Sequence, residues 1–308
     1  MSPSRERAAR APWDPMFRPE DAPDLSLIIG CYNAARQVER TVLALAEFLD
    51  VLGRGWELLI VDDGSSDRTL ELLGNLRTQV PRLMILRNPQ NMGKGFSIRN
   101  GVLNSRGEKI VFTDVDMAFS LSNIRAMIDR LDQGDPVVVA NRRLPDSVYT
   151  ANNRLVRHVY RRHQMGLGFN RLVRLLFGLD TRDTQSGLKG FSREAAMRIF
   201  PAIQTHGFLF DVEIFIRARH LGLDVTEIPV HVTYESDDST VRKFQQFIGL
   251  VPTLARIKLH DLRGGYSDRI RGPLPTPLPL RSLDVPVVEE LPHDASDRES
   301  PFRSSPGR

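Results

Sequence analysis

The sequence contains a single cysteine, Cys31, among 308 residues, so no disulfide can form within the chain. Scarcity of cysteine is typical of a reducing compartment. The chain also lacks any run of about 18 apolar residues, the length that a membrane-spanning helix needs. Its N-terminal segment is charged and has no apolar core of the signal-peptide kind. These absences predict a cytoplasmic protein without an integral membrane segment.

An excess of charge of one sign is missing as well. The 42 Lys and Arg residues face 38 Asp and Glu residues, which leaves a formal charge of +4. With 41% hydrophobic and 26% charged residues, the composition is that of an ordinary globular protein, which excludes collagen-like, coiled-coil and wholly disordered chains. Any basic surface for a partner must therefore be local.

Composition changes near both ends of the chain. Residues 1–23 mix Arg, Pro, Asp and Glu without periodicity, and residues 263–308 contain eight prolines. Such segments do not bury enough apolar surface to fold, so we predict that both are disordered. Between them, we predict one folded domain over 24–240, followed by amphipathic helices over 241–262.

Short apolar runs alternate with amphipathic segments in the first half of the chain. The predicted strands are 25–32, 57–61, 83–86, 109–113 and 137–140, and the predicted helices are 34–52, 66–78, 93–105 and 120–131. This alternation indicates βαβ units and an α/β fold with a mostly parallel sheet. Ligands of such sheets bind beyond the carboxyl ends of the strands, so the residues there are the first candidates for a site.

Two carboxylates, Asp114 and Asp116, end the fourth predicted strand. Residues i and i+2 of an extended segment point to the same side, so both side chains face one point. A hard divalent cation, Mg²⁺ or Mn²⁺, relieves the repulsion between them and can hold a diphosphate. The alternative is a solvated turn whose aspartates cap the next helix.

Polar residues also follow the other strands. Asp62 can accept hydrogen bonds from a ribose or a base, although the same segment suits a turn that caps a helix. Gly93 and Lys94 open a helix, where backbone N–H groups and a lysine attract an anion. Neither G-x-G-x-x-G nor G-x-x-x-x-G-K-[ST] is present, which argues against NAD, FAD and P-loop nucleotide sites.

Together, D-D-G-S-S-D at 62–67, N-M-G-K-G at 91–95 and D-V-D at 114–116 resemble the family 2 glycosyltransferases. D-T-Q-S-G-L-K at 183–189 and G-F-L-F-D-V-E at 207–213 make the chain most similar to the dolichyl-phosphate and polyprenyl-phosphate hexosyltransferases, dolichyl-phosphate beta-glucosyltransferases in particular. The resemblance covers about residues 24–245. It implies the GT-A fold, a Rossmann-like, mostly parallel sheet flanked by helices.

The resemblance also implies roles for individual residues. The residues implied for the nucleotide are Tyr32, Asn33, Asp62, Asp63, Gly93, Lys94 and Asp114. Asp114 and Asp116 would hold Mg²⁺ or Mn²⁺ and, with Asp211, form the catalytic set. Those implied for the sugar, the acceptor and its phosphate are Arg142, Asp183, Gln185, Ser186, Arg242 and Lys243.

Residues 154–177 hold six arginines and no acidic residue, beside an apolar side. Such a segment suits an anionic membrane surface and a lipid-phosphate acceptor, or else packs on the core with a solvated basic face. Gly166 and Gly168 predict two short helices here, and Pro252 should kink or break the second amphipathic segment, 241–262. No nucleic-acid-binding module accompanies the arginines.

The leading hypothesis is inverting transfer of a hexose from a nucleotide sugar, UDP-glucose rather than GDP-mannose, to a polyprenyl phosphate. The enzyme would then be peripheral on the cytoplasmic membrane face. One alternative is a soluble glycosyltransferase with a small phosphorylated or hydroxyl acceptor, for which Asp211 or Glu213 would serve as base. Another is a non-catalytic nucleotide-sugar-binding protein, because Ala34 stands where the family commonly has glutamate.

Overall fold

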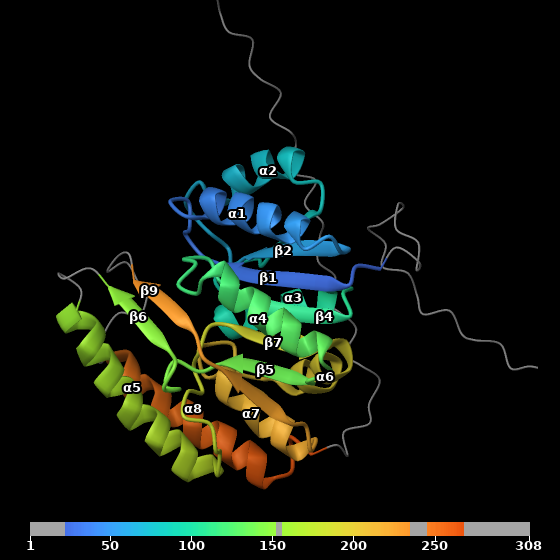
Figure 1. Ribbon diagram of the computed structural model, residues 1–308. Coiled ribbons are helices and arrows are strands. Elements are labelled where there is room, and N and C mark those ends of the chain that lie inside the picture. The colour runs from blue at the N-terminus through green and yellow to red at the C-terminus, as the bar shows by residue number, and fades with distance from the viewer. Residues whose placement is uncertain (1–21, 152–155, 235–244, 268–308) are drawn as a thin grey trace, which may run out of the picture.

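The computed structural model describes residues 22–151, 156–234 and 245–267 and contains one seven-stranded sheet with helices on both faces (Figure 1). Its strands, in spatial order, are β3 (Leu83–Arg87), β2 (Trp56–Asp62), β1 (Leu25–Cys31), β4 (Lys109–Asp114), β7 (Lys189–Ser192), β5 (Val137–Ala140) and β8 (Val225–Ile228). Only β7 runs antiparallel to its two neighbours in this sheet. The predicted, mostly parallel sheet is therefore confirmed.

Four helices alternate with the first five strands, as the sequence predicted. They are α1 (Val38–Val51), α2 (Thr69–Gln79), α3 (Lys94–Asn104) and α4 (Leu121–Asp132). Helix α1 begins four residues after the predicted start at residue 34. The reason is that the N–H groups of Ala34 and Ala35 donate to Thr69 Oγ1 and Asp67 Oδ2 in the next loop, at 2.8 and 3.2 Å.

Each face of the sheet carries its own apolar core. Helices α1, α2 and α4 cover one face, with residues such as Leu45, Leu73 and Ile128 fully buried against it. On the other face, α3 packs beside elements from the second half of the chain. Burial on both faces explains why the central strands are continuous apolar runs rather than alternating ones.

The second half of the chain adds elements that the sequence pattern did not predict. These are β6 (Val148–Ala151), α6 (Arg193–Ile199), the 3₁₀ turn η2 (Phe200–Ala202), α7 (Phe210–His220) and β9 (His231–Tyr234). Strands β6 and β9 pair in parallel as a small second sheet. Two long helices, α5 (Val156–Phe177) and α8 (Gln245–Leu262), run beside the main sheet (Figure 1).

The structure corrects the predictions about these long helices. Helix α5 is one continuous helix rather than two short ones, although it contains Gly166 and Gly168. Helix α8 continues through Pro252, so the break predicted there is wrong, while the kink given as its alternative stays a prediction. A glycine costs a helix about 1 kcal/mol and an interior proline about 3 kcal/mol. Burial of Phe169 and Val173 in α5, and of Leu254 and Ile257 in α8, offsets these costs.

The folded part of the chain also extends beyond the predicted boundary at residue 262. Tyr266 is fully buried, and its hydroxyl donates to the Glu213 carboxylate of α7. The other predicted domain limits stay predictions, because residues 1–21, 235–244 and 268–308 lie outside the described part. Within the described part, no helix is both long and apolar enough to cross a bilayer.

Candidate active site

The carboxyl ends of β1, β2 and β4 lie side by side at one edge of the sheet, on the left in Figure 1. Cys31 is opposite Asp62 in the register of β1 with β2, and Gly30 is opposite Asp114 in that of β1 with β4. The polar segments that follow these strands therefore meet. Cys31 itself is buried, and burial raises the pKa of its thiol, so it is no nucleophile.

The loops after β1 and β2 are joined through Asn33, which adopts a left-handed backbone with φ of 51°. Its N–H donates to Ser65 Oγ at 2.9 Å, and its Oδ1 accepts from the Ser66 N–H at 2.9 Å. The neighbouring Tyr32 is 41% exposed, so its ring is accessible to a ligand. Asn33 thus shapes the edge from which Tyr32 projects.

Asp62 and Asp63 lie in the interior, between this edge and α3. Asp63 Oδ1 accepts from the Asn88 side chain at 2.7 Å and from the Met92 N–H at 2.9 Å, while Oδ2 accepts from the Gly93 N–H at 2.8 Å. Asp63 therefore fixes the loop that precedes α3. Burial raises the pKa of Asp62 above its ordinary value. Contact of these two carboxylates with a nucleotide stays a prediction.

Lys94, the first residue of α3, reaches across to the end of β4. Its Nζ donates to Asp114 Oδ1 at 2.5 Å. Burial lowers the pKa of Lys94, but Asp114, Asp211 and Asp116 together raise it above its ordinary value, so the ammonium stays charged. Lys94 therefore pairs with Asp114, and the charges of Asp116 and Asp211, the other two carboxylates predicted as catalytic, also act on it.

A tight turn after β4 sets the direction of the second carboxylate. Met117 has a positive φ of 53°, which is uncommon for a residue other than glycine, and its N–H donates to the Asp114 carbonyl at 3.3 Å. Asp116 Oδ1 accepts from the Ala118 N–H at 3.2 Å. The D-V-D segment is therefore a strand end followed by a turn that its own backbone and side chains hold.

Asp211, in the first turn of α7, is buried and paired with Lys189. Lys189 Nζ donates to Asp211 Oδ1 at 2.7 Å and to the Ser186 carbonyl at 2.5 Å. Burial lowers the pKa of Lys189 and raises that of Asp211, since desolvation outweighs their mutual attraction. Sequence reasoning missed Lys189, although it ends the D-T-Q-S-G-L-K block that carried the resemblance.

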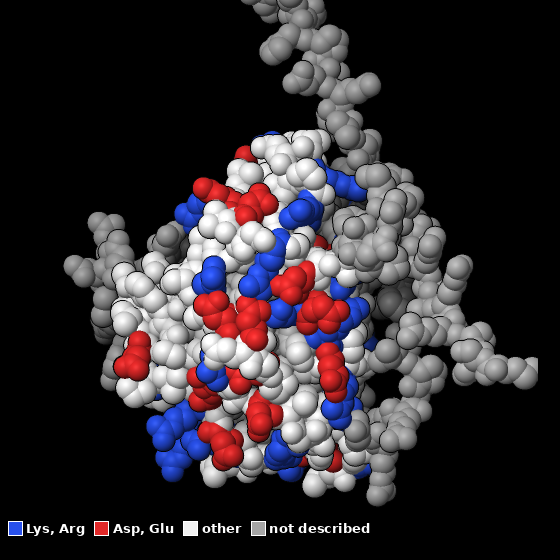
Figure 2. Space-filling view, turned by 45° about the vertical axis from the view of Figure 1, so that its right-hand side comes forward, with Lys and Arg blue, Asp and Glu red and all other residues white. Residues whose placement is uncertain are grey.

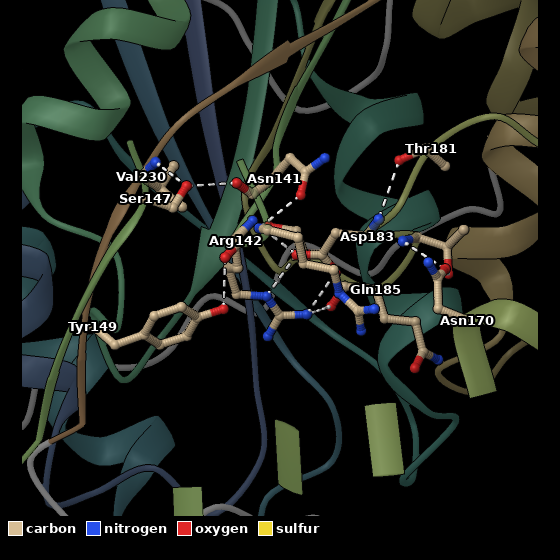
Figure 3. A network of polar contacts seen from close by, with 12 residues as sticks. Asn141, Arg142, Ser147, Tyr149, Asn170, Thr181, Asp183, Gln185 and Val230 are labelled. Carbon is tan, nitrogen blue, oxygen red and sulfur yellow. Dashed lines mark hydrogen bonds and ion pairs between the residues drawn. The ribbon is translucent and has the colours of Figure 1, made fainter. Parts of the chain in front are cut away.

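Arg142, just after β5, holds the loop at 183–187. Its Nε and Nη2 each donate to an oxygen of Asp183 at 2.8 Å, and Nη2 also donates to the Gln185 carbonyl at 3.1 Å. Figure 3 shows the guanidinium lying along this loop. The Tyr149 hydroxyl donates to the Arg142 carbonyl oxygen at 2.7 Å. Burial raises the pKa of Asp183, but the attraction of Arg142 lowers it by more, so this pKa lies below its ordinary value. Arg142 therefore positions the loop.

The far end of this loop lies against the D-V-D segment. A Cβ atom on Gly187 would come within 2.0 Å of Asp114 Oδ2, so only glycine lets the loop approach this closely. Ser186 is fully buried, and its hydroxyl has no hydrogen-bond partner among the described residues. Arg242 and Lys243, predicted for the acceptor phosphate, lie outside those residues.

A protein-family model described as Glycosyl transferase family 2 matches residues 26–200, more than half of the chain. The chain belongs to glycosyl transferase family 2. Among the proteins that resemble this family 2 glycosyltransferase are two named dolichyl-phosphate beta-glucosyltransferase. The protein from Saccharomyces cerevisiae is 31% identical over 265 residues, which cover 79% of this chain and 77% of that one. The protein from Dictyostelium discoideum is 30% identical over 252 residues, with 78% and 75% covered. The predicted hexosyltransferase class is thereby confirmed.

A solved structure supports the fold of this family 2 glycosyltransferase. It is glucosyl-3-phosphoglycerate synthase from Mycobacterium tuberculosis in complex with Mn²⁺, UDP and phosphoglyceric acid. The two chains share 17% identity with a TM-score of 0.51, over 80% of each chain. The predicted GT-A fold is confirmed.

The donor set of this glycosyltransferase fits a hard divalent cation in its chemistry. Asp114 and Asp116 are carboxylates, the ligands that Mg²⁺ and Mn²⁺ prefer, and Asp114 already attracts a cation, the Lys94 ammonium. No three His, Cys, Asp or Glu side chains converge as a metal site in the described ranges. Asp114 and Asp116 are the residues that would hold the metal.

Proposed function

We propose that this family 2 enzyme transfers glucose from UDP-glucose to the phosphate of a polyprenol, with inversion at the anomeric carbon. The observation that carries the proposal is the meeting of Lys94, Asp114, Asp116 and the 183–187 loop at the end of β4. The names of the two yeast and amoebal relatives support a lipid-phosphate acceptor and a glucosyl group for this chain.

On the donor side, an oxygen of the acceptor phosphate attacks the anomeric carbon as the bond from that carbon to the diphosphate breaks. The electron pair stays on the departing diphosphate. Mg²⁺ or Mn²⁺ held by Asp114 and Asp116 would supply stabilisation of this negative charge. Lys94 adds a second positive charge at the same point, and Asn33 and Asp63 position the loops on either side. Tyr32, which is accessible, contacts the base in this proposal.

On the acceptor side, the buried state of the acidic residues favours a phosphate over a hydroxyl group. A hydroxyl acceptor needs a carboxylate that can take its proton, whereas a phosphate is already largely ionised near neutral pH. Asp211 is 3% exposed and bonded to Lys189, and Glu213 accepts from the N–H groups of Gln204 and Thr205. Both carboxylates thus serve structure and electrostatics rather than proton transfer.

Arg143 is a further candidate for the acceptor phosphate, beside the predicted Arg142. The Arg142 Nε and Nη2 are engaged by the 183–187 loop. Arg143 is partly buried, and burial lowers the pKa of its guanidinium. Among the described residues, that guanidinium forms no ion pair at contact distance, although the Asp183 carboxylate attracts it from nearby. A phosphate ester would compensate this charge and gain bidentate hydrogen bonds.

Helices α5 and α8 give this acceptor a route from a membrane. They share one core cluster, and Lys258 Nζ of α8 lies 5.5 Å from the centre of the Phe177 ring of α5. Each helix also exposes large apolar side chains, which we call the α5–α8 face: Leu172, Leu175, Leu176, Val251, Leu259 and Leu262. Arg171 and Arg256 are exposed on the same two helices. We propose that this face lies on an anionic, cytoplasmic membrane surface.

A product assay with the purified full chain tests the proposal. UDP-glucose and GDP-mannose are each offered with Mn²⁺ and with dolichyl phosphate in detergent or with 3-phosphoglycerate, and the radiolabelled product is identified. We expect an organic-soluble glucosyl product with UDP-glucose and the lipid acceptor. Transfer to 3-phosphoglycerate alone would support a soluble glycosyltransferase, and turnover in no combination would support a binding protein without catalysis.

A further inference from the structure

Lys94 lies at the metal-binding position proposed above. It is the first residue of α3 and lies between Gly93, whose φ is 97°, and Gly95, and this fixes its backbone. A Cβ atom on Gly95 would approach the Thr205 carbonyl oxygen to 2.5 Å, so this end of α3 is packed against the loop before α7. The lysine side chain is partly buried and directed to Asp114 Oδ1, 2.5 Å from Nζ. The ion pair is thus a built feature of the fold rather than a surface contact.

The second oxygen of Asp114 is confined as well. Oδ2 lies so close to Gly187 that a methyl group there would collide with it at 2.0 Å. The 183–187 loop cannot retreat easily, because Arg142 and Lys189 hold both of its ends. Asp114 Oδ2 therefore lies against Gly187, and Oδ1 is paired with Lys94.

An ammonium and a divalent cation cannot share this oxygen at low energy, since like charges repel strongly where water is partly excluded. A lysine has a flexible four-carbon stem and three donors, so its head group can move to a new partner without backbone change. The partner that accompanies the metal in the proposed reaction is a diphosphate, whose oxygens attract an ammonium more strongly than one carboxylate does. Arrival of the diphosphate can therefore free Asp114.

We infer that Lys94 is a resident counter-ion of Asp114 that makes metal binding depend on the nucleotide. Without a nucleoside diphosphate, Lys94 keeps Asp114 paired and the metal binds weakly. With it, Lys94 turns to the phosphates and Asp114 becomes available. This inference rests on the proposed function, because it assumes that Asp114 holds a divalent cation. Binding of the two ligands is then positively coupled, and the coupling is reciprocal.

Mn²⁺ binding to the full chain, followed by electron paramagnetic resonance of free Mn²⁺, tests this inference without any turnover. The wild type is titrated with Mn²⁺ alone and with saturating UDP. Lys94→Met removes the charge and keeps most of the stem, Lys94→Gln is a second neutral variant, and Lys94→Arg is the matched control that keeps the charge. Circular dichroism and urea unfolding establish that each variant is folded.

We expect UDP to tighten Mn²⁺ binding to the wild type at least tenfold, within the range of about 5–150-fold that is usual for coupled sites. In the absence of UDP, the neutral variants should bind Mn²⁺ about tenfold more tightly than the wild type, and Lys94→Arg should bind it as weakly as the wild type. Equal affinity of the wild type and both neutral variants for Mn²⁺ alone overturns the inference.

Asp114→Asn separates this failure from failure of the proposed metal site. If UDP-dependent Mn²⁺ binding is present in the wild type and lost in Asp114→Asn, the metal site stands whatever the lysine variants show. If the wild type does not bind Mn²⁺ even with UDP, both the metal site and the role of Lys94 are contradicted.

Discussion

In the amino-terminal half of the fold, residues 22–132, polar side chains contact one another and few large apolar side chains are exposed. In the carboxyl-terminal half, residues 133–267, more large apolar side chains are exposed. Among described residues, the exposed large hydrophobic side chains of the first half are Tyr32, Leu43 and Val51, whereas the second half has ten. Exposed apolar area of this kind marks a surface that meets a partner. In the proposed function, the first half binds the nucleotide and the second half, with its exposed apolar side chains, meets the acceptor.

The side of the sheet opposite the candidate site supports this view of the first half. Figure 2, in which the amino-terminal ends of the strands are turned forward, shows basic and acidic residues interspersed rather than separated by sign. Arg54 and Lys109 each contact both Asp24 and Asp132, at 2.7 to 3.1 Å. Charge there is neutralised within the chain, so it offers no large field of one sign to a partner.

The largest effect on stability should follow from removing the partner of Arg142 in the second half. Asp183→Ala removes the carboxylate that pairs with the partly buried Arg142 guanidinium and loosens the 183–187 loop. Breaking a buried ion pair by removing one member costs about 3–5 kcal/mol, so we expect the free energy of unfolding in urea to fall by about 3 kcal/mol. The exposed Asp180 provides the matched control, Asp180→Ala, which should change it by less than about 0.5 kcal/mol. Equal losses in both variants would contradict the role of the pair.

The pair of Arg142 and Asp183 should also make the free energy of unfolding depend on pH. Because the pKa of Asp183 is lowered in the fold, its contribution to stability is full above the ordinary carboxyl pKa of 3.8. It is lost as the pH falls through the lower folded value. Unfolding free energies measured from pH 6 downward should therefore converge for the wild type and Asp183→Ala at acid pH. A difference that stays constant with pH would argue against this pair as the cause.

Gly187→Ala tests the contact between the two halves with a smaller change. The added methyl group would meet Asp114 Oδ2, so the loop or the carboxylate must shift. A displacement of about 1 Å in a reacting group can cost about 100-fold in rate, and we expect that loss in glucosyl transfer. In Gly168→Ala, where a Cβ atom meets nothing within 4 Å, transfer should stay within about twofold. A Gly187 variant as active as Gly168→Ala would show that the contact has no role.

The α5–α8 face should show an effect of about tenfold on membrane binding. Leu175 is 77% exposed, and Leu172 lies one turn away. Burying a leucine gains about 1.5–3 kcal/mol, so Leu172→Ser with Leu175→Ser should weaken binding to anionic vesicles at least tenfold in flotation at low salt. Leu43→Ser, an exposed leucine of α1 in the first half, is the control and should float like the wild type. Unchanged flotation of the double variant would remove this face from the acceptor route.

The smallest effect is expected in the ion-paired region of the first half. Arg54 and Lys109 lower the pKa of Asp132 from 3.8 to about 2. Since the pairs are partly solvated, Asp132→Asn should cost less than about 1 kcal/mol at pH 7. The wild type should lose this small advantage as the pH falls from 3.8 toward 2, because a lowered pKa stabilises only the ionised state. A deficit of several kcal/mol in urea unfolding would mean that this half depends on its surface charges.

The two halves also differ in how far their sequences predict their structure. In the first half, β3 and β4 each extend one residue beyond their predicted ends, because burial pattern and helix period are local signals. The Asp114 and Asp116 pair was predicted from the same kind of local signal. Contacts between distant segments were not predicted. The sequence indicated that Lys94 attracts an anion, and nothing in the pattern indicated that it would pair with Asp114.

In the second half, most of the information is non-local. Strand β7 has four residues and inserts antiparallel between β4 and β5, and β6 pairs with β9 more than eighty positions away. Such pairings leave no periodic signal in a short window. The breaks predicted at Gly166, Gly168 and Pro252 follow local propensity, which the burial of α5 and α8 side chains overrides.

Transfer measured with Asp114→Asn tests the central claim, that donor and acceptor meet at the end of β4. The assay measures label moved from UDP-glucose to dolichyl phosphate with Mn²⁺, and Asp129→Asn, an exposed carboxylate of α4, is the control. Loss of a group that stabilises charge in the transition state costs about 100- to 1,000-fold. We predict a fall of about 1,000-fold in folded Asp114→Asn and less than twofold in Asp129→Asn. Transfer by Asp114→Asn within tenfold of the wild type would contradict the account.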